Sequence, residues 1–244
     1  MDQTAKPSLD QILLDLTTKK QGILRQPVPG SDRVIDDPVA HANACYGGGY
    51  RVTEYVDRWR KESEYHTTGE FAEIRAKSVL HCGPTAITNL LRCFYRRTGN
   101  RWMARRSAAD LFEVVASEGS RILAYHNGSW HSLFGGTSDL MAGHFINKAA
   151  DAVGMPSLAQ SPPVMIVNRQ LYTWMKEGNL AFLMLHRHEC YRNHHVLCNG
   201  VITVTNHKGE NHRYYQIMDG WAHRPRYVDE RSVKGDLFWK IPQP

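Results

Sequence analysis

The segment that decides the fold is LHCGPTAITNLL, residues 80–91. Its apolar positions recur at intervals of three and four residues, so the sequence predicts a buried helix from Cys82 to Arg97. Pro84 suits the first turn of a helix, because the N–H that proline lacks has no partner there. Gly99 suits the end of the helix. A cysteine is therefore expected at the N-terminus of the first strongly apolar helix.

The chain after this helix is expected to form further helices and then a sheet. Helical spacing between start and stop signals predicts helices over 107–119, 138–154 and 168–178. Short apolar runs bounded by turn residues predict strands over 180–185, 195–205, 214–218 and 237–241. Helices followed by strands are typical of an α+β fold, with a helical part first and an antiparallel sheet after it.

Residues 1–65 differ in character from the rest of the chain. Ser8 and Gln11 form a capping box, which predicts a helix that ends near Gly22. The residues after it are rich in Pro, Gly and Asp and predict a long loop. We therefore interpret 1–65 as an N-terminal extension and 66–244 as one main domain.

Composition narrows the class of protein. The chain has 244 residues, 42% of them apolar and 22% charged, and a formal net charge of +6. It has no apolar run near the roughly 20 residues that span a bilayer, and its start does not resemble a secretory signal. Five cysteines without a paired spacing do not indicate a disulfide framework. The prediction is a cytoplasmic protein with reduced thiols and no membrane partner. Its oligomeric state is left open.

A second pattern concerns chemistry. A thiol attacks as the thiolate, and a helix N-terminus beside an imidazole favours that form. Cys82 has the helix position, and His194 and His195 open a predicted strand. Asp219 ends the next strand, where a hairpin could bring it beside the imidazole and fix its tautomer. These residues form a candidate Cys-His-Asp triad.

The same residues resemble those of the papain-like cysteine peptidase superfamily. Residues 82–86 read CGPTA, as in the bacterial peptidase domains related to those that cleave double-glycine leaders. The family strand His-x-Val-Leu-x-x-Gly matches from His194 to Gly200, whereas His195 is one residue out of register. Asp219 is followed by Gly and Trp, a blend of the papain and leader-peptidase patterns. The similarity covers roughly residues 70–240.

The resemblance implies a papain-like fold and a bacterial thiol protease, a hydrolase of peptide or amide bonds. Cys82 would be the nucleophile that forms a thioester, His194 the base with His195 as its alternative, and Asp219 the residue that orients the base. The substrate would be a peptide or protein, and no cofactor or metal ion would be needed. Trp221 would pack over the His–Asp pair.

One departure from the family pattern bears on activity. The family usually has a Gln six residues before the nucleophile, where this chain has Ala76. The Cys82 N–H, supported by Gly83, is then expected to bind the oxyanion, and Lys77 or Ser78 could replace the Gln. Losing one oxyanion donor commonly costs about 10²–10³ in rate. Two alternatives follow: a catalytically degenerate domain that binds peptides or proteins, and an acyl-transferring relative of the transpeptidase or cyclase type.

Two further interpretations come from other clusters. Residues 186–195 contain four histidines and a cysteine, ligand types that suit zinc, and His186 and His188 would face the same side of a strand. The arginines between 92 and 106 could bind nucleic acid, but they more simply form a solvated helix face, and no nucleic-acid partner is predicted. His126, Trp130 and His131 lie in a Gly-rich loop that could border a cleft.

Overall fold

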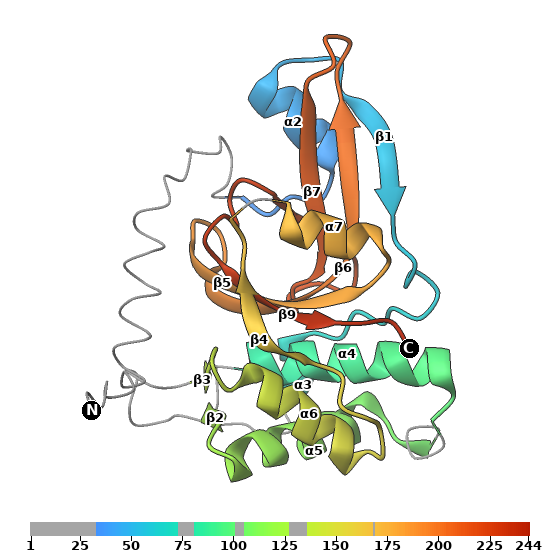
Figure 1. Cartoon of the computed structure of the whole chain (residues 1–244), viewed down its shortest axis with the longest axis vertical. Coiled ribbons are helices and arrows are strands. Elements are labelled where there is room, and N and C mark those ends of the chain that lie inside the picture. Colours follow the sequence, from blue (N-terminus) through green and yellow to red (C-terminus); the bar gives the residue numbers. More distant parts are fainter. Residues whose placement is uncertain (1–32, 73–80, 101–104, 127–135, 168) are drawn as a thin grey trace, which may run out of the picture.

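The computed structural model describes residues 33–72, 81–100, 105–126, 136–167 and 169–244. Within them the chain forms six helices and nine strands (Figure 1). The helices are α2 (Pro38–Tyr46), α3 (Thr68–Ala72), α4 (Cys82–Thr98), α5 (Ala108–Arg121), α6 (Ala142–Ala152) and α7 (Gln170–Lys176). The strands are β1 (Arg51–Val56), β2 (Tyr125–His126), β3 (Gly136–Thr137), β4 (Gln160–Met165), β5 (Leu180–His188), β6 (Arg192–Thr205), β7 (Asn211–Met218), β8 (Arg226–Asp229) and β9 (Leu237–Ile241).

The main sheet is antiparallel and is organised around the long strand β6. Its order is β4-β9-β5-β6-β7-β8, with β1 also paired to β6. The first half of β6 pairs with β5, and its second half, from Val201 to Thr205, pairs with β1 along the same edge. On its other edge β6 pairs with β7 from Leu197 onward. One strand therefore links the half of the sheet that packs on helices to a projecting half.

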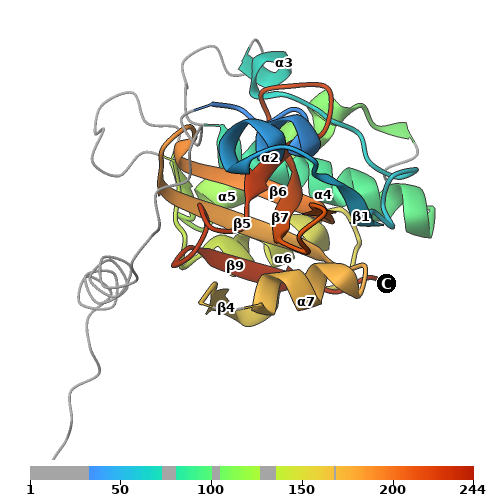
Figure 2. The same ribbon diagram turned by 90° about the horizontal axis from the view of Figure 1, so that it is seen from above.

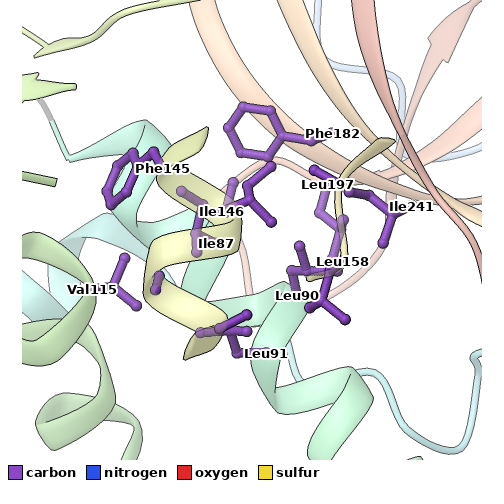
Figure 3. Packing of buried hydrophobic residues seen from close by; sticks show 14 of the residues in the cluster. Ile87, Leu90, Leu91, Val115, Phe145, Ile146, Leu158, Phe182, Leu197 and Ile241 are labelled. Carbon is purple, nitrogen blue, oxygen red and sulfur yellow. The ribbon is translucent and has the colours of Figure 1, made fainter. Parts of the chain in front are cut away.

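The helices α3 to α6 gather on one face of the sheet, as the lower layer in Figure 1. The apolar face of α4 packs against α5, α6 and the sheet in a fully buried core (Figure 3). The members labelled there are Ile87, Leu90, Leu91, Val115, Phe145, Ile146, Leu158, Phe182, Leu197 and Ile241. This burial keeps the N-terminus of α4 at a fixed place beside the sheet.

Two smaller cores complete the packing. Leu171 and Met175 of α7 pack on the opposite face of the sheet, against Leu183 and Val196 among others. The helix α2 lies over the far ends of β6 and β7, with Ala42 buried there (Figure 2). In the described part of the chain, every helix is too short or too polar to cross a membrane.

The structure confirms the α+β class and the antiparallel sheet. It also confirms the helix that begins at Cys82 and the predicted helix over 107–119, which is α5. A capping box formed by Ser107 and Asp110 begins α5. The third predicted helix begins later, at Ala142, because the segment before it forms a turn in which the N–H of Ser138 donates to Ala124. The carboxylate of Asp139, in this segment, contacts His186 of β5 and His195 of β6.

The N-terminal region differs from the predicted long loop. From Ile35 onward it is part of the packed body, with α2 and β1 in place of an extended loop. β1 joins the sheet because the second half of β6 has an edge that β5 does not reach. Trp59 is fully buried in the main core and donates to the carbonyl of Gly178 at 2.8 Å. The predicted helix between Ser8 and Gly22 lies outside the described residues.

The arginines at the end of α4 are engaged with the chain itself. Arg92 and Arg96 both pair with Glu64, at 2.7 and 2.8 Å. The guanidinium of Arg97 lies 3.6 Å from the centre of the Trp59 ring. These contacts give this basic segment a structural role on the surface of α4.

Candidate functional site

Cys82 is the first residue of α4 and is half-buried. The first N–H groups of a helix have no partner within the helix, and together with the helix dipole they favour an anion. Gly83 follows in close contact with Thr137 of β3, and a Cβ at Gly83 would overlap that side chain. The absence of a side chain at Gly83 lets β3 approach the start of the helix.

Two imidazoles reach the Cys82 thiol from the start of β6. The Nδ1 atom of His195 lies 3.5 Å from the Cys82 Sγ atom. Burial alone would raise the pKa of this thiol, but hydrogen bonds from His194 and His195, and their positive charge, hold its pKa well below the usual value. The thiolate–imidazolium pair is therefore the favoured state of the site.

His195 is held from behind by a carboxylate. Its Nε2 atom lies 2.8 Å from the Oδ1 atom of Asp139, and its ring stacks on Phe182. The other Asp139 oxygen is hydrogen-bonded to Nε2 of His186, whose Nδ1 atom lies 3.7 Å from Asp236. Burial opposes charge on these groups. The hydrogen bonds outweigh it, lowering the pKa of Asp139 and raising that of His195 to about 10 and that of His186 to about 9.

His194 is held by a main-chain oxygen. Its Nε2 atom donates to the carbonyl of Asp219 at 2.6 Å. The Asp219 carboxylate, which the sequence analysis assigned to orient the imidazole, is occupied elsewhere. It accepts hydrogen bonds from the Tyr191 hydroxyl at 3.1 Å, from Arg226 at 3.0 Å and from the N–H groups of Trp221 and Ala222. Asp219 thus positions His194 through its backbone, while its side chain fixes the surrounding loop.

The proton positions on the two rings follow from these partners. A carbonyl and an ionised carboxylate only accept hydrogen bonds, so Nε2 carries a proton in both histidines. When either ring is neutral, its Nδ1 atom is then the acceptor. For His195 this atom faces the Cys82 Sγ atom, which permits proton transfer between sulfur and nitrogen.

The other predicted site residues divide into two groups. Trp221 packs its ring against His194 and Tyr191, at 4.9 and 4.8 Å between ring centres, and remains 45% exposed. It therefore covers the His194 ring while presenting an aromatic surface to solvent. Ala76, at the position of the family Gln, and the oxyanion candidates Lys77 and Ser78 lie outside the described residues, as do Trp130 and His131. His126 is the exposed end of β2.

The histidine-rich segment does not have the geometry expected of a zinc site. Arg187 has a positive φ of 49°, and the register of β5 shifts between Leu185 and His188. As a result, the side chains of His186 and His188 bond to different partners. His186 reaches Asp139, whereas His188 bonds to Ser232 and to the N–H groups of Cys190 and Tyr191. Among the described residues, no three His, Cys, Asp or Glu side chains are arranged to hold a metal ion.

Asp139 and Tyr191 were not found by sequence reasoning. Asp139 lies far from the other site residues along the chain, and in a Thr-Ser-Asp run before a helix it is indistinguishable from a capping residue. Tyr191 stacks on His194 at a ring angle of 9°, but a tyrosine before a strand has many structural uses. The signal that could have found Asp139 is the pair of histidines His186 and His195, each of which needs a partner once buried.

Comparison with known proteins adds no family to this geometry. The chain matches none of the protein-family models against which it was compared, and no curated protein matches it either. The function is therefore argued from the residues and their arrangement.

Proposed function

We propose that this protein is a cysteine-nucleophile enzyme of papain-like type that acts on a peptide or amide bond. The observation that carries the proposal is the Cys82 thiol at the N-terminus of α4, 3.5 Å from the Nδ1 atom of His195. His194 and His195 both lower the pKa of this thiol against the effect of burial. A helix N-terminus with two imidazoles is the environment that stabilises a reactive thiolate. The resemblance of residues 82–86 and 194–200 to the papain-like peptidases supplies the substrate class.

The reaction balances with the groups of the site. The Cys82 thiolate attacks the carbonyl carbon and forms a C–S bond, and the carbonyl oxygen becomes an oxyanion. The C–N bond then breaks, and the leaving amine takes a proton from an imidazolium of the site. Water or an amine, deprotonated by the neutral imidazole, attacks the thioester and releases the thiolate. Hydrolysis and acyl transfer differ only in this last nucleophile.

The oxyanion needs donors close to the nucleophile. The N–H groups of Cys82 and Gly83 belong to the first turn of α4, where N–H groups have no helical partner. Free N–H groups at a helix N-terminus are a general means of binding an anion. These two groups are our candidates for oxyanion stabilisation.

The first test is alkylation of the folded protein with iodoacetamide across pH, followed by mass spectrometry. Cys82 is expected to react at about pH 6, where an ordinary thiol is almost fully protonated. Replacing both His194 and His195 by Gln should remove that reactivity. Cys45 is the internal control, because it is also half-buried and burial raises its pKa. Equal rates at Cys82 and Cys45 at this pH would contradict the proposal.

A second test separates an enzyme from a binding module. A library of peptides that carry an electrophilic group should form a covalent adduct at Cys82, and Cys82→Ser should abolish the adduct. Amide cleavage or transfer is then measured with the peptides that react. A peptide that binds Cys82→Ala and the unsubstituted protein equally, without any adduct or turnover, would favour the degenerate binding domain.

A further inference from the structure

The hydrogen-bonded chain that begins at His195 joins the strands β6 and β5 to the segments before α6 and before β9. His195 lies on β6 and contacts Asp139, which precedes α6; Asp139 in turn contacts His186 on β5. The N–H of His186 donates to a carboxylate oxygen of Asp236, just before β9, at 3.1 Å. The indole of Trp239 donates to the main-chain carbonyl of Asp139 at 3.2 Å and anchors that segment. Residues from several segments of the sheet and its connections therefore hold this arrangement, and it does not depend on one loop alone.

We propose that Asp139 is a positioning residue that keeps His195 as a lasting imidazolium beside the Cys82 thiolate, so that His194 exchanges protons with the substrate. This inference rests on the proposed function, because it assumes that Cys82 is the nucleophile. It assigns the two histidines different roles. His195 supplies charge, and His194 supplies the mobile proton.

The different partners of the two rings support this division. A carboxylate stabilises the protonated form of the imidazole it faces far more than a neutral carbonyl does, because it adds a negative charge to the hydrogen bond. His195 has the carboxylate of Asp139, and His194 has the carbonyl of Asp219. Both rings are buried, His194 at 6% and His195 at 9% residue exposure, so the division of roles rests on their partners and not on burial. The His195 ring packs on Phe182, whereas the His194 ring packs under the exposed Trp221.

The charged and titratable groups around His195 are consistent with a stable cation. Cys82 faces it from α4, Asp139 faces it from the segment before α6, and His194 is its neighbour on β6. His186 shares the carboxylate of Asp139 and is itself paired with Asp236. Two carboxylates and one thiolate thus accompany three imidazoles. His186 and His195 can stay protonated while His194 takes up a proton and gives it to the leaving group, since the net charge of these groups then varies only between −1 and 0.

The experiment compares the pH dependence of Cys82 alkylation in Asp139→Asn and in the unsubstituted protein. Asparagine keeps the shape and a hydrogen-bonding oxygen but removes the charge. The alkylation rate at about pH 6 should fall by about tenfold or more, since each unit of rise in thiol pKa lowers the thiolate fraction tenfold. Near pH 10 the two rates should be the same, because both thiols are then ionised and access is unchanged. Asp139→Glu, which restores the charge, should recover part of the rate at low pH.

The matched control is Asp151→Asn, the same change at an exposed residue of α6. It should leave the pH profile unchanged. Identical profiles in Asp139→Asn and the unsubstituted protein would overturn the inference while leaving the proposed function intact. If the unsubstituted Cys82 has no reactivity at low pH, the proposed function itself fails. The two failures are therefore distinguishable.

A direct measurement covers the case in which Asp139→Asn does not fold. NMR of the unsubstituted protein with ¹⁵N-labelled histidine, assigned with His195→Gln, reports the protonation of each ring. The His195 ring should stay protonated at both nitrogens to about pH 8, beyond the usual histidine range near 6.5. A His195 ring that loses its proton near pH 6.5 would overturn the inference without any variant of Asp139.

Discussion

The thiols of Cys45 and Cys82 each lie close to a histidine ring, and their surroundings shift their pKa values in opposite directions. The Cys45 Sγ atom is 3.6 Å from Nε2 of His41, much as Cys82 is close to His195. Burial and the nearby Asp229 carboxylate nevertheless raise the pKa of Cys45, which lies in the last turn of α2. A helix C-terminus disfavours an anion, whereas the N-terminus that holds Cys82 favours one. A Cys–His contact alone therefore does not make a nucleophile.

The two roles of Asp219, backbone and side chain, can be separated by Asp219→Asn. The substitution removes the charge that pairs with Arg226 and leaves the carbonyl that accepts from His194. We expect a loss of about 2 kcal/mol in the free energy of unfolding, typical of a hydrogen bond to a charged group, measured by urea denaturation. The pH profile of Cys82 alkylation should stay that of the unsubstituted protein. A profile shifted toward that of an ordinary thiol would instead make the carboxylate the orienting group, as the sequence predicted.

At the scale of elements, the contact between the start of α4 and β3 joins two parts of the site. Gly83 touches Thr137, which lies two residues before Asp139. Gly83→Ala would force the two segments apart, so we expect a loss of about 2 kcal/mol in unfolding free energy, as for other overpacked positions. The low-pH reactivity of Cys82 should fall as well, because Asp139 moves with β3.

The control for this contact is the double variant Gly83→Ala with Thr137→Gly, which removes the atoms that the new methyl group would meet. Both stability and reactivity should recover relative to Gly83→Ala alone, as expected when two residues interact directly. Additive effects of the two substitutions would show that the contact does not determine the position of β3.

The elements were more predictable than the contacts between them. Periodicity and capping residues predicted α4 and α5 because their signals are local. β1 was missed because its partner, the second half of β6, lies about 150 positions later in the chain. His194 and Cys82 were found through short motifs. Asp139 was missed because its contact with the buried His195 ring exists only in the folded protein. No local sequence pattern indicates that contact.

At the scale of the whole molecule, the site links protonation to folding. The lowered pKa of Cys82 favours the loss of a proton on folding, and the raised pKa of His195 favours the gain of one. These two shifts change the number of bound protons in opposite directions, so their effects on the pH dependence of stability oppose each other. The raised pKa of His186 acts at neutral and alkaline pH, whereas the lowered pKa of its partner Asp139 acts below about pH 4.

The stability of the protein should accordingly decline on the alkaline side. The pKa of His186 is raised to about 9, so its contribution is fully present below about pH 6.5 and is lost as the pH rises toward 9. The expected loss is on the order of 1–3 kcal/mol in unfolding free energy, measured by urea denaturation at about pH 6.5, 8 and 9. His186→Gln should be less stable at the lowest of these pH values and should show a flatter profile. An unfolding free energy of the unsubstituted protein that stays constant or rises over this pH range would contradict a charged His186 in the folded protein. Of the two histidines that contact Asp139, that result would leave only His195 as a cation.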